Sequence, residues 1–155
     1  MTVLASGVLL YRPGGGRRSP TLLLLRNRED GRWGFPKGRR EAGDIHELET
    51  ALREVEEETG YAGLVVHPTF RRTVEYVVAA REDHGKPKRV VYFLARAPAE
   101  EPRLSPEHDD YCWADGLVAR ELLDYAKLRD LAQHALASVI GGLADGHDGP
   151  GPGAG

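Results

Sequence analysis

Four glutamates lie within five positions of one another, and their spacing could hold a metal ion. The segment from Arg53 to Tyr61 reads Arg-Glu-Val-Glu-Glu-Glu-Thr-Gly-Tyr. Residues three and four apart are neighbours on a helix, so Glu54, Glu57 and Glu58 would share one face. Adjacent carboxylates repel one another unless a cation lies between them. The spacing therefore predicts either a divalent-metal site or a solvated acidic face.

The pattern around these glutamates is typical of an amphipathic helix. With ~100° per residue, the glutamates fall beside an apolar side made of Leu48, Ala51, Leu52 and Val55. We expect Asp44 to be the N-cap, with Glu47 completing a capping box. Gly60 should end the helix in a left-handed conformation. The prediction is a helix of roughly four turns whose exposed flank carries the carboxylates.

A glycine-punctuated loop with one cation precedes this helix. Residues 33–38 hold two aromatic rings, two glycines and Lys37, and two arginines follow. Backbone N–H groups and Lys37 can contact phosphate oxygens, while a metal ion links other phosphate oxygens to the carboxylates. The combination favours a metal-bridged phosphate substrate over a solvated acidic face.

The two segments together resemble the signature of the Nudix hydrolases, G-x5-E-x7-R-E-U-x-E-E-x-G-U, where U is apolar. Gly38 and the stretch from Arg53 match it, with the semi-polar Tyr61 at the last apolar site. Asp44 stands where the first glutamate belongs, and eight residues instead of seven separate it from Arg53. In the family that glutamate helps to hold the arginine, so the departure concerns the loop geometry more than metal binding.

Several outer segments are similar to one Nudix subgroup, the asymmetrical diadenosine tetraphosphate hydrolases. The most discriminating is the Ser-x-Glu-His-x-x-Tyr element, which runs from Ser105 to Tyr111. The resemblance implies attack of water on a phosphorus of a dinucleoside polyphosphate, which would convert diadenosine tetraphosphate to ATP and AMP. Two alternatives are hydrolysis of another nucleoside diphosphate-X, such as a nucleoside triphosphate or a diphosphoinositol polyphosphate, and a non-catalytic nucleotide-binding module. The intact acidic triad favours an enzyme.

The resemblance also implies metal ligands and a catalytic group. Glu54, Glu57 and Glu58 are expected to bind the ion, and Glu107 matches a distal glutamate that is a further ligand or the base for water. Mg²⁺ is the expected ion and Mn²⁺ an alternative, since both take oxygen ligands. Arg53 is expected to pair with a carboxylate of the helix face and to hold its orientation.

Further positions match substrate contacts of the subgroup. They are Lys37, Lys86 and Lys88 for phosphate, Tyr76 and Tyr111 for adenine, and His108 for substrate or for orienting Glu107. Lysine suits phosphate as a mobile point charge, and stacking on an aromatic ring is worth ~1–3 kcal/mol per base. The ordinary alternatives are a solvated lysine, a tyrosine packed in the core and an exposed loop glutamate.

Length and composition fit one α/β domain with a small-molecule nucleotide substrate. The chain has 155 residues, 41% of them hydrophobic, and a net charge of −3, which argues against a nucleic-acid partner. It has no apolar run long enough for a membrane span. The single Cys112 cannot form an internal disulfide, which fits the reducing cytoplasm. A monomer and a homodimer are both compatible with the sequence.

The order of expected elements resembles the Nudix α/β/α sandwich with a mixed β-sheet. We expect strands at residues 3–11, 21–25, 64–66, 70–78 and 89–95, a short closing strand at 111–113, and helices at 117–123 and 126–143. A charged loop at 81–88 should join two of the strands. The prediction assigns residues 1–144 to the Nudix domain and 145–155 to a flexible Gly/Pro-rich tail.

Overall fold

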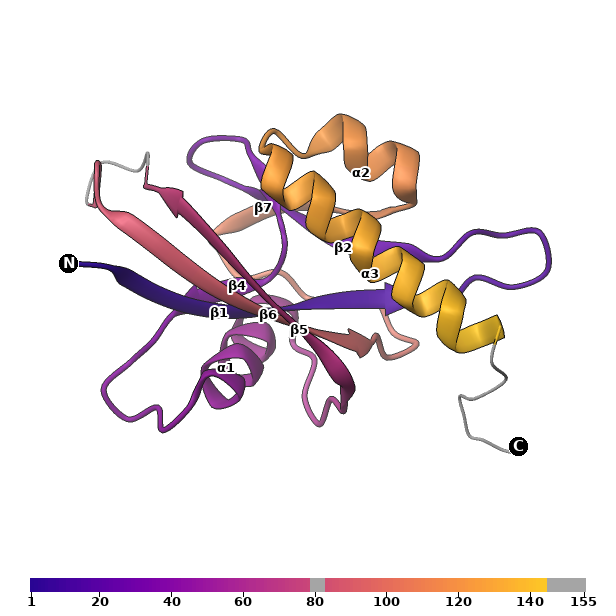
Figure 1. Ribbon diagram of the computed structural model, residues 1–155, viewed down its shortest axis with the longest axis horizontal. Coiled ribbons are helices and arrows are strands. Elements are labelled where there is room, and N and C mark those ends of the chain that lie inside the picture. The colour runs from indigo at the N-terminus through magenta and orange to yellow at the C-terminus, as the bar shows by residue number, and fades with distance from the viewer. Residues whose placement is uncertain (79–82, 145–155) are drawn as a thin grey trace.

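The computed structural model describes residues 1–78 and 83–144, side chains up to residue 142, and has a mixed β-sheet between two helical layers. Figure 1 shows α1 on one side of the sheet and both α2 and α3 on the other. The strands are β1 (Val3–Arg12), β2 (Thr21–Asn27), β3 (Trp33–Gly34), β4 (Lys37–Arg39), β5 (Val66–Val77), β6 (Pro87–Arg96) and β7 (His108–Ala114). The helices are α1 (Glu47–Thr59), α2 (Gly116–Leu122) and α3 (Ala126–Ala144). The predicted α/β class is confirmed.

The sheet is mixed because one pair of neighbours is parallel. Its main path runs β3-β2-β1-β6-β5, with β4 paired to β1 and β7 paired to β2. Strands β1 and β6 are parallel, from Val3 opposite Lys88 to Tyr11 opposite Arg96, and the other pairs are antiparallel. This order brings β4 and β7, far apart in the sequence, to the adjacent strands β1 and β2.

Two apolar clusters fill the spaces on the two faces of the sheet. Successive side chains of a strand point to opposite faces, and the run of four leucines in β2 shows the alternation. Leu22 and Leu24 pack with α2 and α3 in what we call the α3-side core, while Leu23 and Leu25 pack with α1 in the α1-side core. A run that is apolar at every position thus serves both layers.

The acidic helix ends as predicted but begins differently. Gly60 caps it with φ of 79°, and its N–H donates to the carbonyl of Glu56. The predicted N-cap, Asp44, is wrong: the N-cap is His46, whose side chain accepts from the N–H of Glu49. Asp44 lies in the preceding loop, where its carboxylate accepts from the N–H of Glu41. The helix therefore begins at Glu47, after the loop that contains Asp44, and the additional residue of the signature lies in the segment before the helix.

Other boundaries differ from the prediction where strands bend or pair over long distances. The expected strands 64–66 and 70–78 are one strand, β5, with an irregular register between Val66 and Arg71. The expected loop at 33–38 contains the short strands β3 and β4, and the closing strand β7 spans seven residues. Part of the charged loop and the whole predicted tail lie outside the described residues. Among the described helices, none is long and apolar enough to cross a membrane.

Candidate active site

Four of the predicted carboxylates open onto a single cleft of about 620 Å³. Glu54, Glu57 and Glu58 come from α1, and Glu107 comes from the residue before β7. The backbone carbonyl of Glu107 accepts from the N–H of Arg28, 2.8 Å away, which ties this segment to the end of β2. The other lining residues are Asn27, Phe35, Lys37, Gly38, Arg39, Arg40, Glu41 and His108. The structure therefore brings together groups from α1, β4 and the start of β7.

Glycine at position 38 allows β4 to lie directly against α1. Gly38 is opposite Ser6 in the antiparallel pairing of β4 with β1. A Cβ atom at Gly38 would overlap the carboxyl group of Glu54. A second close approach lies at Gly7, where a Cβ would overlap the carbonyl oxygen of Pro36. The two glycines let the loop before α1 settle on β1, which sets where the glutamates point.

Arg53 holds the carboxylates of the helix face in place. Its Nη1 atom lies 2.7 Å from Glu54 Oε2 and 3.2 Å from Glu57 Oε2. Its Nη2 atom donates to Asp44 Oδ2 at 2.8 Å, and Thr50 Oγ1 also donates to that oxygen. The hydrogen bond from Arg53 keeps the pKa of Asp44 well below its ordinary value. Arg53 thus pairs as predicted, and Asp44 anchors it despite the altered spacing.

Two of the glutamates are buried, whereas the sequence predicted an exposed acidic flank. Glu54 is 8% exposed and Glu58 is 4% exposed, while Glu57 faces solvent. Burial raises the pKa of Glu58 to about 8, with a further contribution from Glu54 and Glu107. The backbone N–H of Lys37 donates to Glu58 Oε1 at 3.2 Å. The flank is buried because β4 covers it. A helical wheel describes the helix alone and gives no information on this contact.

The donor set of the cleft fits a hard divalent cation. Glu54, Glu57, Glu58 and Glu107 would hold it, because carboxylate oxygens are the ligands such ions prefer and Mg²⁺ keeps several waters besides. Among the described residues, no three His, Cys, Asp or Glu side chains already converge as a closed metal site. In this structure Arg53 engages Glu54 and Glu57. The buried like charges of this cleft would be compensated by a cation.

The two tyrosines predicted to contact adenine pack against different clusters, Tyr76 against the α3-side core and Tyr111 against the α1-side core. Tyr76 stacks on Tyr125, with ring centroids 5.9 Å apart and an interplanar angle of 20°. The guanidinium of Arg32 lies 5.3 Å from the Tyr125 ring centroid and donates to the Tyr125 hydroxyl. Tyr111 packs against the α1-side core, and its hydroxyl donates to Glu101. Tyr125 was not among the residues predicted from the sequence, which indicated only that it lies between two predicted helices.

The three predicted lysines occupy different places. Lys37 lines the carboxylate cleft, and Lys88 lies close enough to Lys37 for the two ammonium groups to affect each other. Burial lowers the pKa of Lys88 to about 8, and repulsion from Lys37 and Arg39 adds to the shift. Lys86 bonds to Asp83 and lines a neighbouring cleft. Lys88 is opposite Tyr76 across β5 and β6, so phosphate and ring contacts would be adjacent.

His108 is the remaining predicted contact, and it reaches the carboxylate cleft. It is partly buried, and its Nδ1 atom has no hydrogen-bond partner among the described residues. Burial lowers its pKa, so the neutral ring is favoured there. The arginines and Asn27 that line the same cleft were not predicted. In the sequence, only the two consecutive basic residues Arg39 and Arg40 indicated that arginines could reach the site.

Comparison with known proteins agrees with this geometry. Residues 1–133 match the NUDIX domain family. The asymmetrical bis(5'-nucleosyl)-tetraphosphatase of Rattus norvegicus is 37% identical over 143 residues, covering 86% of this chain and 92% of that protein. The enzyme of the same name from Caenorhabditis elegans is 32% identical, covering 91% of this chain and 99% of that protein. This chain therefore belongs to the Nudix family.

A solved structure is similar over almost the same extent. It is a C. elegans Ap4A hydrolase in a binary complex, with a TM-score of 0.79 and 31% sequence identity. The match covers 90% of this chain and 98% of that chain. The predicted Nudix fold is confirmed over nearly the whole described length.

Proposed function

We propose that this protein is a divalent-metal-dependent hydrolase of dinucleoside polyphosphates, and that it cleaves diadenosine tetraphosphate asymmetrically to ATP and AMP. The observation that carries the proposal is the cleft that unites four carboxylates with the ammonium of Lys37. The named activity of the relatives that match over most of their length supports the same substrate class. Residues 1–144 are proposed as the catalytic domain.

The carboxylates and cations of the cleft would divide the work of phosphoryl transfer. A bound divalent cation supplies charge neutralisation at the phosphoryl oxygens and lowers the pKa of bound water. Lys37 and Lys88 neutralise and orient phosphate oxygens, which places the reacting phosphorus next to the glutamates. Arg53 acts through Glu54 and Glu57 by holding their carboxylates in one orientation.

The attacking water must lose a proton as its oxygen bonds to phosphorus and the bridging P–O bond breaks. We propose Glu107 as the acceptor, because it lines the same cleft as the α1 glutamates and has no ion-pair partner among the described residues. The alternative role for Glu107 is a further metal ligand. A carboxylate within hydrogen-bond reach of the water can take this proton as a general base.

Tyr76 and Tyr125 are proposed to bind one nucleobase. Their rings already stack on each other, and Arg32 extends the stack on the Tyr125 side. Stacking tolerates different bases, since every base has a π-face. The proposal does not include Tyr111, whose hydroxyl is bonded to Glu101 away from the stack. An adjacent base and phosphate site favours a nucleotide over an inositol phosphate.

The finer features of the proposal follow from the same residues. Mg²⁺ is the proposed ion, with Mn²⁺ as a substitute, because the donors are all carboxylates. The cytoplasm is the proposed compartment, since Cys112 is a free thiol in the structure. A monomer and a homodimer both remain compatible with the proposed chemistry.

The direct test incubates purified protein with Mg²⁺ and diadenosine tetraphosphate, then separates the nucleotides. Equal amounts of ATP and AMP support the proposal. Two molecules of ADP per substrate, or no turnover while a nucleoside triphosphate or a diphosphoinositol polyphosphate is cleaved quickly, contradict it. Tyr125→Ala sharpens the result: KM for the dinucleotide should rise about tenfold, since base stacking is worth ~1–3 kcal/mol. Hydrolysis of a diphosphoinositol polyphosphate should not respond to this change.

A further inference from the structure

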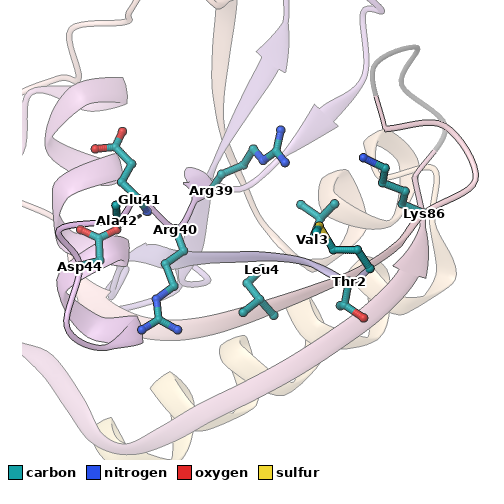
Figure 2. Close-up of a pocket in the computed structure, with 10 residues that line it drawn as sticks. Thr2, Val3, Leu4, Arg39, Arg40, Glu41, Ala42, Asp44 and Lys86 are labelled. Atoms are coloured by element: carbon teal, nitrogen blue, oxygen red, sulfur yellow. Dashed lines mark hydrogen bonds between the residues drawn. The ribbon is translucent and has the colours of Figure 1, made fainter.

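Arg39 lies at the junction of two clefts. It lines the carboxylate cleft and also a neighbouring cleft of about 350 Å³. Arg40 and Glu41 line both clefts as well, so the two clefts are neighbours along β4 and the loop after it. Figure 2 shows the charged ends of Arg39 and Lys86 directed toward one another, while Arg40 extends in a different direction. Arg39 therefore contributes to both clefts, with its charged end on the side of Lys86 (Figure 2).

A carboxylate joins Arg39 to Lys86. Asp83 Oδ2 lies 3.0 Å from Arg39 Nη1, and Asp83 Oδ1 lies 3.0 Å from Lys86 Nζ. The Asp83 side chain is 12% exposed, whereas the Arg39 side chain is 53% exposed. The hydrogen bond from Lys86, together with Arg39 and Lys88, lowers the pKa of Asp83, so it is an anion at neutral pH. One internal anion is thus shared between two cations.

Positive charge is in excess along this edge of the protein. Lys37, Lys88, Arg39 and Lys86 follow one another from the carboxylate cleft to the second cleft. The repulsion is large enough to contribute to the lowered pKa of Lys88. The three lysines were expected to contact phosphate because of the resemblance to the subgroup, whereas Arg39 and Asp83 were not among the expected site residues. An additional anion would relieve the repulsion.

We propose that Arg39 binds an outer phosphate of the substrate, and that Asp83 is an internal competitor which holds Arg39 and Lys86 until that phosphate displaces it. The identity of the ligand as an oligophosphate rests on the function proposed above. A guanidinium presents its N–H donors in a fork that fits phosphate as well as carboxylate, so one anion can replace the other. A phosphate chain long enough to reach Arg39 gains this contact but must break the two ion pairs of Asp83. A shorter chain leaves Asp83 in place and gains no contact with Arg39.

The first test measures binding without catalysis. Isothermal titration calorimetry of the full chain with inorganic tripolyphosphate measures its affinity. In metal-free buffer, this affinity comes from the cationic side chains and not from a bound metal ion. Arg39→Gln should weaken binding about fivefold to tenfold, because a charge-assisted contact is lost at a half-exposed site. Asp83→Asn should tighten binding about threefold, since the competing anion is gone. Arg17→Gln is the matched control, an exposed arginine in the β1–β2 turn without a partner among the described residues, and should bind as the unchanged protein does.

The second test uses kinetics with dinucleoside polyphosphates of increasing phosphate number. Arg39→Gln should raise KM more than it lowers kcat, and more for the longer substrates. In the double variant Arg39→Gln/Asp83→Asn, the gain from Asp83→Asn should shrink, because the change then frees Lys86 but no longer Arg39. Thermal unfolding of each variant checks that it is folded.

The outcomes separate this proposal from the proposed function. If Arg39→Gln binds tripolyphosphate as tightly as the unchanged protein, or if Asp83→Asn weakens binding, the inference is wrong even when diadenosine tetraphosphate is hydrolysed. If the calorimetric changes appear but diadenosine tetraphosphate is not cleaved, the anion site stands and the proposed substrate is wrong.

Discussion

The helices on the two faces of the sheet bury opposite kinds of surface. On its buried side α1 places Glu54 and Glu58 next to Ala51 and Val55. By contrast, α3 buries leucine, alanine and valine side chains, all in the α3-side core: Leu128, Leu131, Ala132, Ala135, Leu136 and Val139. Burying a charge costs free energy unless it is paired, while burying an apolar side chain stabilises the fold. We therefore propose that α1 carries the chemistry, while the apolar side chains of α3 contribute to stability.

The difference also explains how each helix tolerates its sequence. The carboxylates of α1 depend on particular partners. Arg53 donates to Glu54 and to Asp44, and the backbone N–H of Lys37 donates to Glu58. The apolar side chains of α3 need only volume and shape. A substitution in α1 should therefore change activity more than stability, and a substitution in α3 should do the reverse.

The largest expected effect is on α1. Glu57→Gln should lower kcat on the order of 100- to 1,000-fold, the range seen when one group that stabilises transition-state charge is removed. The free energy of unfolding should change little, because the Glu57 side chain is 56% exposed. Steady-state kinetics and urea denaturation measure the two quantities. The matched control is Glu56→Gln, one residue away and exposed, which should retain activity. Retained activity in Glu57→Gln would remove this residue from the metal site.

Truncation of a side chain in the α3-side core should lower stability and leave activity nearly unchanged. Leu131→Ala should lower the free energy of unfolding by about 2–5 kcal/mol, since Leu131 is 4% exposed and its loss leaves a cavity. Urea denaturation measures the loss, and kcat per folded molecule should stay within about twofold because α3 supplies no group to the carboxylate cleft. Leu117→Ala is the exposed control on α2 and should cost little. A large fall in kcat for folded Leu131→Ala would break the division between the two layers.

The contact between β4 and α1 can be tested without removing a functional group. Gly38→Ala should lower kcat about 10- to 100-fold, because the added methyl group pushes the Glu54 carboxyl out of position. Gly34→Ala is the control, since a Cβ there meets no atom within 4 Å. Kinetics at saturating metal and substrate would measure both variants. Equal activity in the two variants would show that the position of Glu54 is not critical.

The smallest expected effect is a pH dependence of KM that arises from the titration of Lys88. Burial and neighbouring cations lower the pKa of Lys88 to about 8. Its ammonium charge is present below that pH and is lost as pH rises through it, so KM should increase several-fold between about pH 7 and about pH 9. Lys88→Arg keeps its charge over this interval and should flatten the rise. Identical profiles for the two proteins would exclude Lys88 as a phosphate contact.

The sequence alone determined the parts of the site that depend on helical spacing. Glu54, Glu57 and Glu58 share one side because the period of an α-helix is fixed by backbone geometry. Gly60 ends the helix for a similarly local reason, since glycine readily adopts positive φ. The signature between Gly38 and Tyr61 also indicated the family, which the match over residues 1–133 confirms. These features need no knowledge of what packs against the helix.

Only the tertiary structure decided which side chains meet across the sheet. Tyr111 lies opposite Leu25 in the β2–β7 register, and Leu25 faces α1, so this ring lies on the α1 side, away from Tyr76. A shift of one residue in that register would have moved Tyr111 to the other face. The burial of Glu54 and Glu58 and the shared Asp83 likewise depend on residues distant in sequence. Strand pairing and close approach at glycine fix these contacts, and neither can be derived from local spacing.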